Sequence, residues 1–204
     1  MTLGLGALLL AAGYLLGSVP FGVAVARLLA GVDPRQVGSG NIGASNVARS
    51  AGKGAGALTL LLDAAKAALP MLAAEAVLLR AGASPGAAEA WKVAVGLAAF
   101  AGHLWPVWLR FQGGKGVASA FGVFLVLAPM PALLGAAAFA IGFAATHIPA
   151  VGSLAGTAVC AAGTFMVHGA VSPVPWAGLV VSALIVWRHR GNIRRMVRGE
   201  EHRA

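Results

Sequence analysis

Hydroxyl, amide and basic side chains gather between residues 37 and 49, where the sequence is Val37-Gly-Ser-Gly-Asn-Ile-Gly-Ala-Ser-Asn-Val-Ala-Arg49. Glycine tolerates positive φ and close backbone approach, so successive N–H groups can converge on an anion. Arginine adds a planar fork that matches phosphate. A plain polar turn between helices is the alternative, but the density of these residues favours an anion site. The candidates are Gly38, Gly40 and Gly43, the side chains of Ser39, Asn41 and Ser45, and Arg49.

A second cluster has the sequence Gly102-His-Leu-Trp-Pro-Val-Trp-Leu-Arg-Phe-Gln-Gly-Gly-Lys-Gly-Val-Ala-Ser119. Glycines and a lysine come directly before an apolar run, which places a turn, a cation and a helix N-terminus together. The spacing is not that of a Walker A loop, because Gly116 stands where Ser or Thr would hold Mg²⁺. A basic interfacial anchor, with Trp105 and Trp108 as belt aromatics, is the alternative, and both roles are compatible. The candidates are Gly113, Gly114, Lys115 and Gly116.

The C-terminal segment, residues 188–204, is strongly basic and carries His189 and Asn192 three positions apart. If the segment is helical, these two side chains share one face. A polybasic helix lying on anionic lipid is the alternative, and it explains the arginines. It does not explain why a histidine and an asparagine stand where the last apolar run ends, so both are candidate site residues.

Two opposite charges, Asp63 and Lys66, lie three residues apart within an apolar run. Charged groups are costly to bury in a membrane, and an ion pair is the least costly arrangement. The pair either orients its helix or contacts substrate directly, and both interpretations stay open. His103, beside another apolar run, is expected to be a structural hydrogen-bonding residue rather than a catalyst.

Acidic residues and cysteine are scarce in this chain. The six carboxylates do not cluster in a metal-ligand pattern, the five histidines lack His-x-x-x-His spacing, and a single cysteine excludes a disulfide framework. A Gly-x-Ser-x-Gly elbow for a serine hydrolase is also missing. We therefore expect no metal and no cofactor, and anionic ligands held by arginine, lysine and N–H groups.

The composition predicts that these segments are positioned by helices in a membrane. Apolar residues make up 59% of the 204 residues, charged residues 10%, and the mean hydropathy is +0.84. A soluble domain has about 25% charged residues to cover its surface. The composition therefore excludes a soluble domain and a disordered chain, and it predicts a polytopic membrane protein with a net charge of +9.

A spanning helix needs about 20 apolar residues, so the apolar runs predict an all-α transmembrane bundle of about seven spans. Residues 1–204 are expected to form a single domain. Gly and Ala are abundant in every run, which allows close helix packing. The break at 128–131 is the least sharply marked. The predicted spans are residues 3–30, 55–80, 88–109, 116–130, 132–147, 152–168 and 174–188.

Basic residues fall almost entirely on one side of this arrangement. Seven spans put twelve Lys and Arg residues on one side and Arg80 on the other. Because basic loops stay in the cytoplasm, we expect an external N-terminus, a cytoplasmic C-terminus and all three polar segments on the cytoplasmic face. The first 26 residues lack the basic region of a cleavable signal peptide. The twelve are Arg27, Arg35, Arg49, Lys53, Arg110, Lys115, Arg188, Arg190, Arg194, Arg195, Arg198 and Arg203.

In order along the chain, the three segments resemble motifs of the bacterial membrane glycerol-3-phosphate acyltransferase family that uses acyl phosphate as donor. Residues 38–49 are similar to Gly-Ser-Gly-Asn-x-Gly-x-Thr-Asn-x-x-Arg, with Ser45 in place of the usual Thr. Residues 102–118 resemble Gly-His-x-x-Pro…Gly-Gly-Lys-Gly-Val-Ala, with Gln in place of a frequent Lys before the glycines. Residues 189–201 resemble His-x-x-Asn-Ile-x-Arg…Gly-x-Glu, and residues 61–66 resemble a Leu-x-Asp-x-x-Lys stretch.

The resemblance implies transfer of a fatty acyl group from acyl phosphate to the 1-hydroxyl of sn-glycerol 3-phosphate. The products would be 1-acyl-glycerol 3-phosphate (lysophosphatidic acid) and phosphate, in the first step of phospholipid biosynthesis at the bacterial inner membrane. It assigns the acyl phosphate to the first glycine-rich segment with Asn41 and Ser45, and puts Ser153, in a cytoplasmic turn at 151–155, near the site. For the phosphate of glycerol 3-phosphate it implies Ser39, Arg49, Lys115, His189 and Asn192.

The chemistry of these residues is compatible with that reaction. Acyl phosphate is an activated donor, so cations and N–H dipoles that hold two phosphates together are sufficient, without a protein nucleophile. The hydroxyl proton goes either to His189 or to a phosphate oxygen of the substrate. Ser39 is the other candidate catalytic residue.

The expected partners are the two substrates and membrane lipid, and not nucleic acid. A monomer is compatible with the sequence, which does not set the oligomeric state. A small anion transporter or channel is the main alternative, and it would need inverted repeats that the sequence lacks. A CDP-alcohol phosphotransferase would need an acid-rich metal motif, which is also missing.

Overall fold

The computed structural model describes residues 2–201, and all regular structure in that range is helical. By its internal contacts the chain divides into two compact units, the first ending at Val126 and the second beginning at Leu127. The all-α class predicted from the sequence is therefore confirmed. Arg203, which was counted among the cytoplasmic charges, lies outside the described residues.

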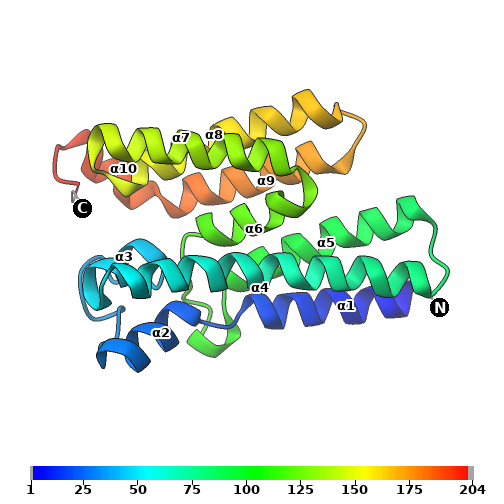
Figure 1. Cartoon of the computed structure of the whole chain (residues 1–204), viewed down its shortest axis with the longest axis horizontal. Helices are drawn as coiled ribbons and strands as arrows, with labels where there is room; N and C mark the ends of the chain where they lie inside the picture. Colours follow the sequence, from blue (N-terminus) through cyan, green and yellow to red (C-terminus); the bar gives the residue numbers. More distant parts are fainter. Residues whose placement is uncertain (1, 202–204) are drawn as a thin grey trace. The chain divides into compact units, whose positions relative to one another are not determined.

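The first unit is built on three long helices that pack side by side, α1, α4 and α5 (Figure 1). Two short helices, α2 and α3, pack against α4 near its N-terminal end. The bounds are α1 Thr2–Gly17, α2 Phe21–Ala30, α3 Ala44–Ala51, α4 Lys53–Arg80, α5 Pro85–Leu104, the 3₁₀ turn η1 Val107–Leu109 and α6 Val117–Leu127.

The first apolar run, predicted as one span over 3–30, is a single candidate membrane span over Leu3–Ala30, but it consists of two helices rather than one continuous helix. Helix α1 ends at Gly17 and α2 begins at Phe21. Pro20 lies in the break and has no N–H to continue the helical hydrogen bonds. The hydroxyl of Ser18 donates to the Tyr14 carbonyl at 2.8 Å. The break leaves main-chain groups near Val19 that need partners from elsewhere in the fold.

Small residues allow the helix backbones to approach closely, as the composition predicted. A Cβ added to Gly17 would collide with the Ala99 backbone of α5. On α5, a Cβ added to Gly102 would collide with the Tyr14 carbonyl of α1. Helices in lipid gain their packing energy from such close contacts, so the glycine content of these runs is explained by helix packing.

In the second unit, the described residues 127–201 form four helices, in which α7 packs on α8, α8 on α9, and α9 on the short α10 (Figure 1). Proline occupies the first turn of α7, α8 and α9, where its missing N–H has no helical partner to lose. Gly135 and Gly156 bring α7 and α8 together. The bounds are α7 Pro129–Thr146, α8 Pro149–His168, α9 Pro173–Arg188 and α10 Arg190–Val197.

Five apolar stretches of the described residues are long enough to cross a membrane by length and composition, the first of them containing the break between α1 and α2. Two shorter apolar helices, α6 and α9, occupy the remaining predicted spans. Large apolar side chains are exposed along these helices, for example Leu8, Ile141 and Met166. An apolar exterior of this kind is suited to lipid, and the protein is an integral membrane protein with several apolar helices.

Candidate functional site

The first polar segment, residues 31–49, consists of a loop that leads into α3. The glycine-rich pattern predicted a loop throughout, but Ser45 and Arg49 lie on the helix. Gly38 and Gly40 have φ of +58° and +68°, conformations that favour glycine. Gly43 has an extended backbone and precedes the first helical residue. The segment is therefore a tight glycine turn followed by a helix N-terminus.

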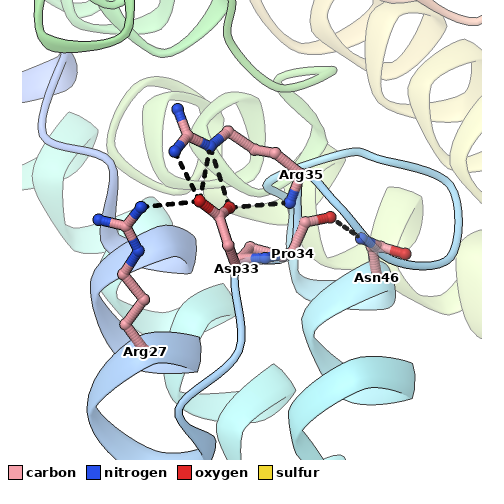
Figure 2. Close-up of polar contacts among 5 residues, drawn as sticks. All are labelled: Arg27, Asp33, Pro34, Arg35 and Asn46. Carbon is pink, nitrogen blue, oxygen red and sulfur yellow. Dashed lines mark hydrogen bonds and ion pairs between the residues drawn. The ribbon is translucent and has the colours of Figure 1, made fainter.

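One buried side chain, Asn46, holds this turn together (Figure 2). Its Nδ2 group lies 2.7 Å from the Pro34 carbonyl and within 3.1 Å of two more, those of Asn41 and Val37. Its Oδ1 accepts the Ser39 N–H at 2.9 Å. Two N–H hydrogens serve three carbonyls, so at least one hydrogen bond is shared.

Asn46 is one of the amide side chains of the predicted segment and part of the quoted motif, but it was given no role in the site. Its spacing in the chain does not reveal that its amide turns back onto residues 34–41. The usable signal is chemical, because a glycine-rich loop with unpaired carbonyls and N–H groups needs a side chain that both donates and accepts, and Asn is such a side chain.

A second anchor of the same segment is Asp33, which pairs with two arginines (Figure 2). Its carboxylate lies 2.7 Å from Arg27 and 2.6 Å from Arg35, and it also accepts the Arg35 backbone N–H. The hydrogen bonds from Arg35 hold the pKa of the Asp33 carboxyl well below its usual range, and the same pair raises the pKa of Arg35. These two arginines are therefore partly neutralised by one carboxylate.

Several N–H groups of the turn are already used within the protein. The Ser39, Gly40 and Gly43 N–H groups donate to Asn46, Val37 and Asn41. These three groups do not form the convergent N–H cradle that the glycines suggested. Of the predicted site side chains in the segment, those of Ser39, Ser45 and Arg49 are exposed, and no side chain caps α3 within the described residues.

The second cluster forms the glycine-lysine turn, which is residues Gly113, Gly114, Lys115 and Gly116. The Gly113 N–H donates to the Leu104 carbonyl and the Gly114 N–H to the His103 carbonyl, at 3.2 and 3.1 Å. Both N–H groups are thus committed to the end of α5 rather than pointing at an anion. A Cβ at Gly114 would collide with the His103 imidazole, whereas Gly116 needs glycine for its φ of +88°.

A buried charge cluster, which consists of Asp63, Lys66 and His103, contacts this turn through the His103 ring. Lys66 Nζ is 2.8 Å from Asp63 Oδ1 and donates to the Val19 carbonyl at 2.8 Å. His103 Nδ1 is 3.7 Å from the same carboxylate oxygen, which is longer than a hydrogen bond. The predicted ion pair between Asp63 and Lys66 is confirmed, and the lysine contacts the break between α1 and α2.

In the second unit, His189 stands at the junction of α9 and α10 and is buried. Its Nδ1 lies 2.8 Å from the Ile185 carbonyl. A carbonyl only accepts, so Nδ1 carries the hydrogen and the lone pair of the neutral ring is on Nε2. The sequence offered no acid to orient this histidine, and in the structure a main-chain carbonyl does so.

The tail after His189 is helical, as the sequence allowed, and Glu201 holds it. Asn192 donates to Glu201 at 2.7 Å, and Arg195 donates to the other carboxylate oxygen at 2.9 Å. Asn192 therefore uses its amide N–H₂ group in a structural contact. Glu201 was part of the quoted motif but was not assigned a role, because its partners become apparent only when the tail folds back.

Ser153, predicted to lie in a turn at 151–155, is instead inside α8. Pro149 starts that helix two residues before the predicted turn. The Ser153 hydroxyl donates to the Pro149 carbonyl at 2.8 Å, one turn earlier. Among the described residues, no group of three His, Cys, Asp or Glu side chains has a geometry suited to a metal ion.

The structure distributes the predicted residues between the two units. The first unit carries Ser39, Asn41, Ser45 and Arg49 on one continuous segment, and Lys115 on the glycine-lysine turn. The second unit carries Ser153 in α8, and His189 and Asn192 around the start of α10.

Comparison with known sequences shows similarity over nearly the whole chain. Residues 7–199 match the family described as glycerol-3-phosphate acyltransferase. A glycerol-3-phosphate acyltransferase of Anaeromyxobacter sp. (strain Fw109-5) is 61% identical over 98% of this chain and 96% of its own length. One from Myxococcus xanthus (strain DK1622) is 50% identical over 94% and 95%.

Solved structures show the same fold. A crystal structure of PlsY, an integral membrane glycerol 3-phosphate acyltransferase in its glycerol 3-phosphate form, has 38% identity and a TM-score of 0.86. The match covers 98% of this chain and 95% of that one. The lysophosphatidic acid form has 35% identity and a TM-score of 0.84, covering 97% and 94%.

Proposed function

This chain belongs to the glycerol-3-phosphate acyltransferase family and is an acyltransferase, and we propose that its acyl donor is an acyl phosphate. Its acceptor is glycerol 3-phosphate and its product lysophosphatidic acid, since structures of a 38% and a 35% identical relative are described as the forms with these two compounds. This reaction is an acylation of phospholipid biosynthesis. The family membership favours the enzyme over the anion transporter or channel.

The observation that carries the donor proposal is the first polar segment. Asn46 fixes its turn, and the exposed side chains of Ser39, Ser45 and Arg49 are hydroxyl groups and a cation suited to phosphate oxygens. Asn41 is half-buried beside them. We assign the acyl phosphate to this segment, with Ser39 and Arg49 also contributing to the phosphate of the acceptor. Lys115 on the glycine-lysine turn is assigned to that second phosphate.

The proposed step needs no protein nucleophile. The 1-hydroxyl oxygen of glycerol 3-phosphate attacks the acyl carbonyl carbon, a C–O ester bond forms, and the bond from that carbon to the phosphate oxygen breaks. Phosphate leaves as an anion, which the basic and hydroxyl groups stabilise. Ser39 is assigned as a hydrogen-bonding catalytic residue, and Ser153 and Asn192 as substrate-binding residues.

The hydroxyl proton has two candidate acceptors. Donation from Nδ1 to the Ile185 carbonyl keeps the lone pair of His189 on Nε2, as a general base requires. A phosphate oxygen of the substrate is the other candidate. His189→Ala should lower kcat by about 10²–10⁴ if the imidazole is the base. A change confined to KM would instead assign His189 to binding and the proton to the substrate.

We further propose seven membrane spans, with the N-terminus outside and the C-terminus and the polar segments on the cytoplasmic face of the bacterial inner membrane. The support is the twelve-to-one distribution of basic residues and the two short apolar helices that complete the set of spans. Single cysteines in a Cys160→Ser background test it. Cysteine at Ala87 should react with an impermeant thiol reagent in intact cells, and cysteine at Gln36 should not; the reverse result overturns the orientation.

The donor is tested with purified full-length protein, acyl phosphate, glycerol 3-phosphate and a chelator. We expect lysophosphatidic acid and inorganic phosphate to appear in equal amounts. Parallel reactions contain acyl-CoA or acyl carrier protein loaded with the same chain. Product from acyl-CoA or acyl carrier protein but not from acyl phosphate would contradict the proposed donor while leaving the acyltransferase assignment intact.

A further inference from the structure

The buried charge cluster of Asp63, Lys66 and His103 has no part in the proposed reaction, yet it lies directly against one of the segments assigned to phosphate. All three side chains are at most 3% exposed. Buried charges of this kind are costly and persist where the surrounding structure or the function requires them. Each of the three makes a different contact, and the contacts connect two irregular parts of the backbone.

Lys66 makes the contact at the first irregular part. Its Nζ donates to the Val19 carbonyl, at the break between α1 and α2, and lies 5.9 Å from the centre of the Phe21 ring. The same nitrogen pairs with Asp63 at 2.8 Å. The lysine thus supplies a donor to a carbonyl in an interrupted helix and holds the Asp63 carboxylate in place.

His103 makes the contact at the second irregular part. Its Nδ1 faces the Asp63 carboxylate at 3.7 Å, and its Nε2 faces the Cα of Gly114 so closely that a Cβ could not fit. The His103 carbonyl accepts the Gly114 N–H. Ring and main chain of one residue therefore both support the turn that carries Lys115.

Asp63 also connects to the helix that follows the turn. The Ser119 hydroxyl, in the first turn of α6, donates to the Asp63 carbonyl at 3.0 Å. Gly122, one turn later, approaches the Ala64 carbonyl so closely that a side chain there would collide with it. The glycine-lysine turn is thus held on one side by the end of α5 and on the other by α6 resting on α4.

We propose that Asp63, Lys66 and His103 are positioning residues that set the conformation of the glycine-lysine turn, and through it the location of Lys115 in the acyltransferase site. The inference rests on the proposed function for the role of Lys115. The cluster acts through the turn and does not touch the substrate. An ion pair anchored at the helix break orients the imidazole, and the imidazole sets how closely Gly114 packs on α5.

A pair of double-mutant cycles tests the proposal with purified full-length protein. His103→Gln is combined with Lys115→Arg, on the turn, and separately with Arg49→Lys, on α3. We expect His103→Gln alone to lower kcat/KM for glycerol 3-phosphate about tenfold. Because residues that act through one another are not additive, its effect should shrink at least about threefold in the Lys115→Arg background and stay unchanged in the Arg49→Lys background.

Asp63→Asn is the second variant, and it should show the same coupling to Lys115 because it changes the cluster without altering the residues of the turn. Thr59→Val is the matched control. Thr59 is buried on the same helix one turn earlier, and its hydroxyl donates to the Ala55 carbonyl of that helix. Thr59→Val should leave kcat/KM near the wild-type value and show no coupling. If a variant were only less stable, the fraction of active protein would fall equally in every background, and no coupling to Lys115 would be measured.

Hydrogen exchange gives a readout that does not depend on activity. In His103→Gln and Asp63→Asn, amides of residues 104–118 should exchange faster, with residues 38–49 unchanged. Additive cycles together with unchanged exchange in residues 104–118 would overturn the proposal. A wild-type protein without transferase activity would overturn the proposed function, and the exchange experiment would then still decide whether the cluster positions the turn.

Discussion

The first polar segment and the glycine-lysine turn carry similar residues, glycines beside one basic side chain, but they are held in place by different means. The first is held by Asn46 and Asp33, whose partners lie within twelve residues along the chain. The turn is held by α5 and by a cluster that joins residues 19, 63, 66 and 103. The conformation of the first polar segment is therefore stabilised by contacts among nearby residues, whereas that of the glycine-lysine turn is stabilised by contacts with helices distant in the sequence.

Among the variants that distinguish the two segments, removal of the Asn46 side chain should have the largest effect on stability and turnover. Asn46→Ala leaves three carbonyls and the Ser39 N–H without their partner. Only the hydrogen bond to the Pro34 carbonyl is fully buried, and an unsatisfied buried group costs about 1–3 kcal/mol, so we expect a loss of that size in the stability of the segment, together with loss of turnover. Hydrogen exchange of residues 34–46 should rise while residues 104–118 stay protected. Equal exchange in both regions would show that the two are not independent.

Removal of the basic residue from each segment should have the next largest effect, which is a loss of catalytic efficiency. Arg49→Ala and Lys115→Ala should each lower kcat/KM for glycerol 3-phosphate by about 10- to 100-fold, because each loses a charge-assisted hydrogen bond. Initial-rate kinetics measure this, and thermal unfolding should be near that of the wild type. Arg80→Ala, on the side assigned to the exterior, is the control. Unchanged kinetics in either variant would contradict the assignment of that residue to phosphate.

A methyl group at Gly114 should produce a smaller, local effect. Gly114→Ala forces the turn away from His103, because the added Cβ would overlap the ring. We expect kcat/KM to fall about tenfold, since overpacking of this kind costs about 1–3 kcal/mol. Gly54→Ala on α4 is the matched control, because a Cβ there meets no atom within 4 Å. Its activity should equal that of the wild type, and Gly114→Ala activity at that level would contradict the described packing.

The smallest effect is expected from the pH dependence of the Asp33 pairs. Pairing lowers the pKa of Asp33, so the stability it contributes is fully present above its unfolded pKa of about 4 and is lost as the pH falls below that value. The arginines are largely exposed, so the contribution is about 0.5–1 kcal/mol. The difference in thermal unfolding between the wild type and Asp33→Asn should be largest at pH 7 and should narrow as the pH falls below about 4, because the loss is complete only below the lowered folded-state pKa. A constant difference would exclude this titration.

Much of the fold could be predicted from the sequence because lipid imposes simple requirements. Apolar runs and proline positions located α4, α7, α8 and α9 to within about three residues, the usual precision of helix ends. The break at Ser18–Pro20 was missed because the residues around it are as apolar as a continuous span. Helix α3 was missed because it is short, carries polar residues and directly follows a glycine-rich loop, and because it packs against α2 and α4.

The sequence also predicted the candidate site only in part, namely its residue types but not their hydrogen-bond partners. The spacing of glycines, Arg49 and Lys115 indicated anion chemistry, but it did not show that five of the glycine-region N–H groups bond within the protein. A linear pattern gives residue types, whereas a donor's partner depends on which carbonyl the fold brings near it. For the same reason Asn46 and Glu201, each of which organises a segment, had no recognisable signal by spacing alone.

The sequence by itself determined the class of protein, its helical segments and the family motifs, since composition and periodicity follow from the solvent around each residue. Tertiary structure alone decided that the predicted Asp63–Lys66 pair lies beside the His103 ring, which packs on the distant glycine-lysine turn, and that the His189 ring is oriented by a carbonyl. These contacts either join groups that are distant in the sequence or depend on the junction between two helices, as at His189 between α9 and α10. Geometry of this kind is set only when the helices pack.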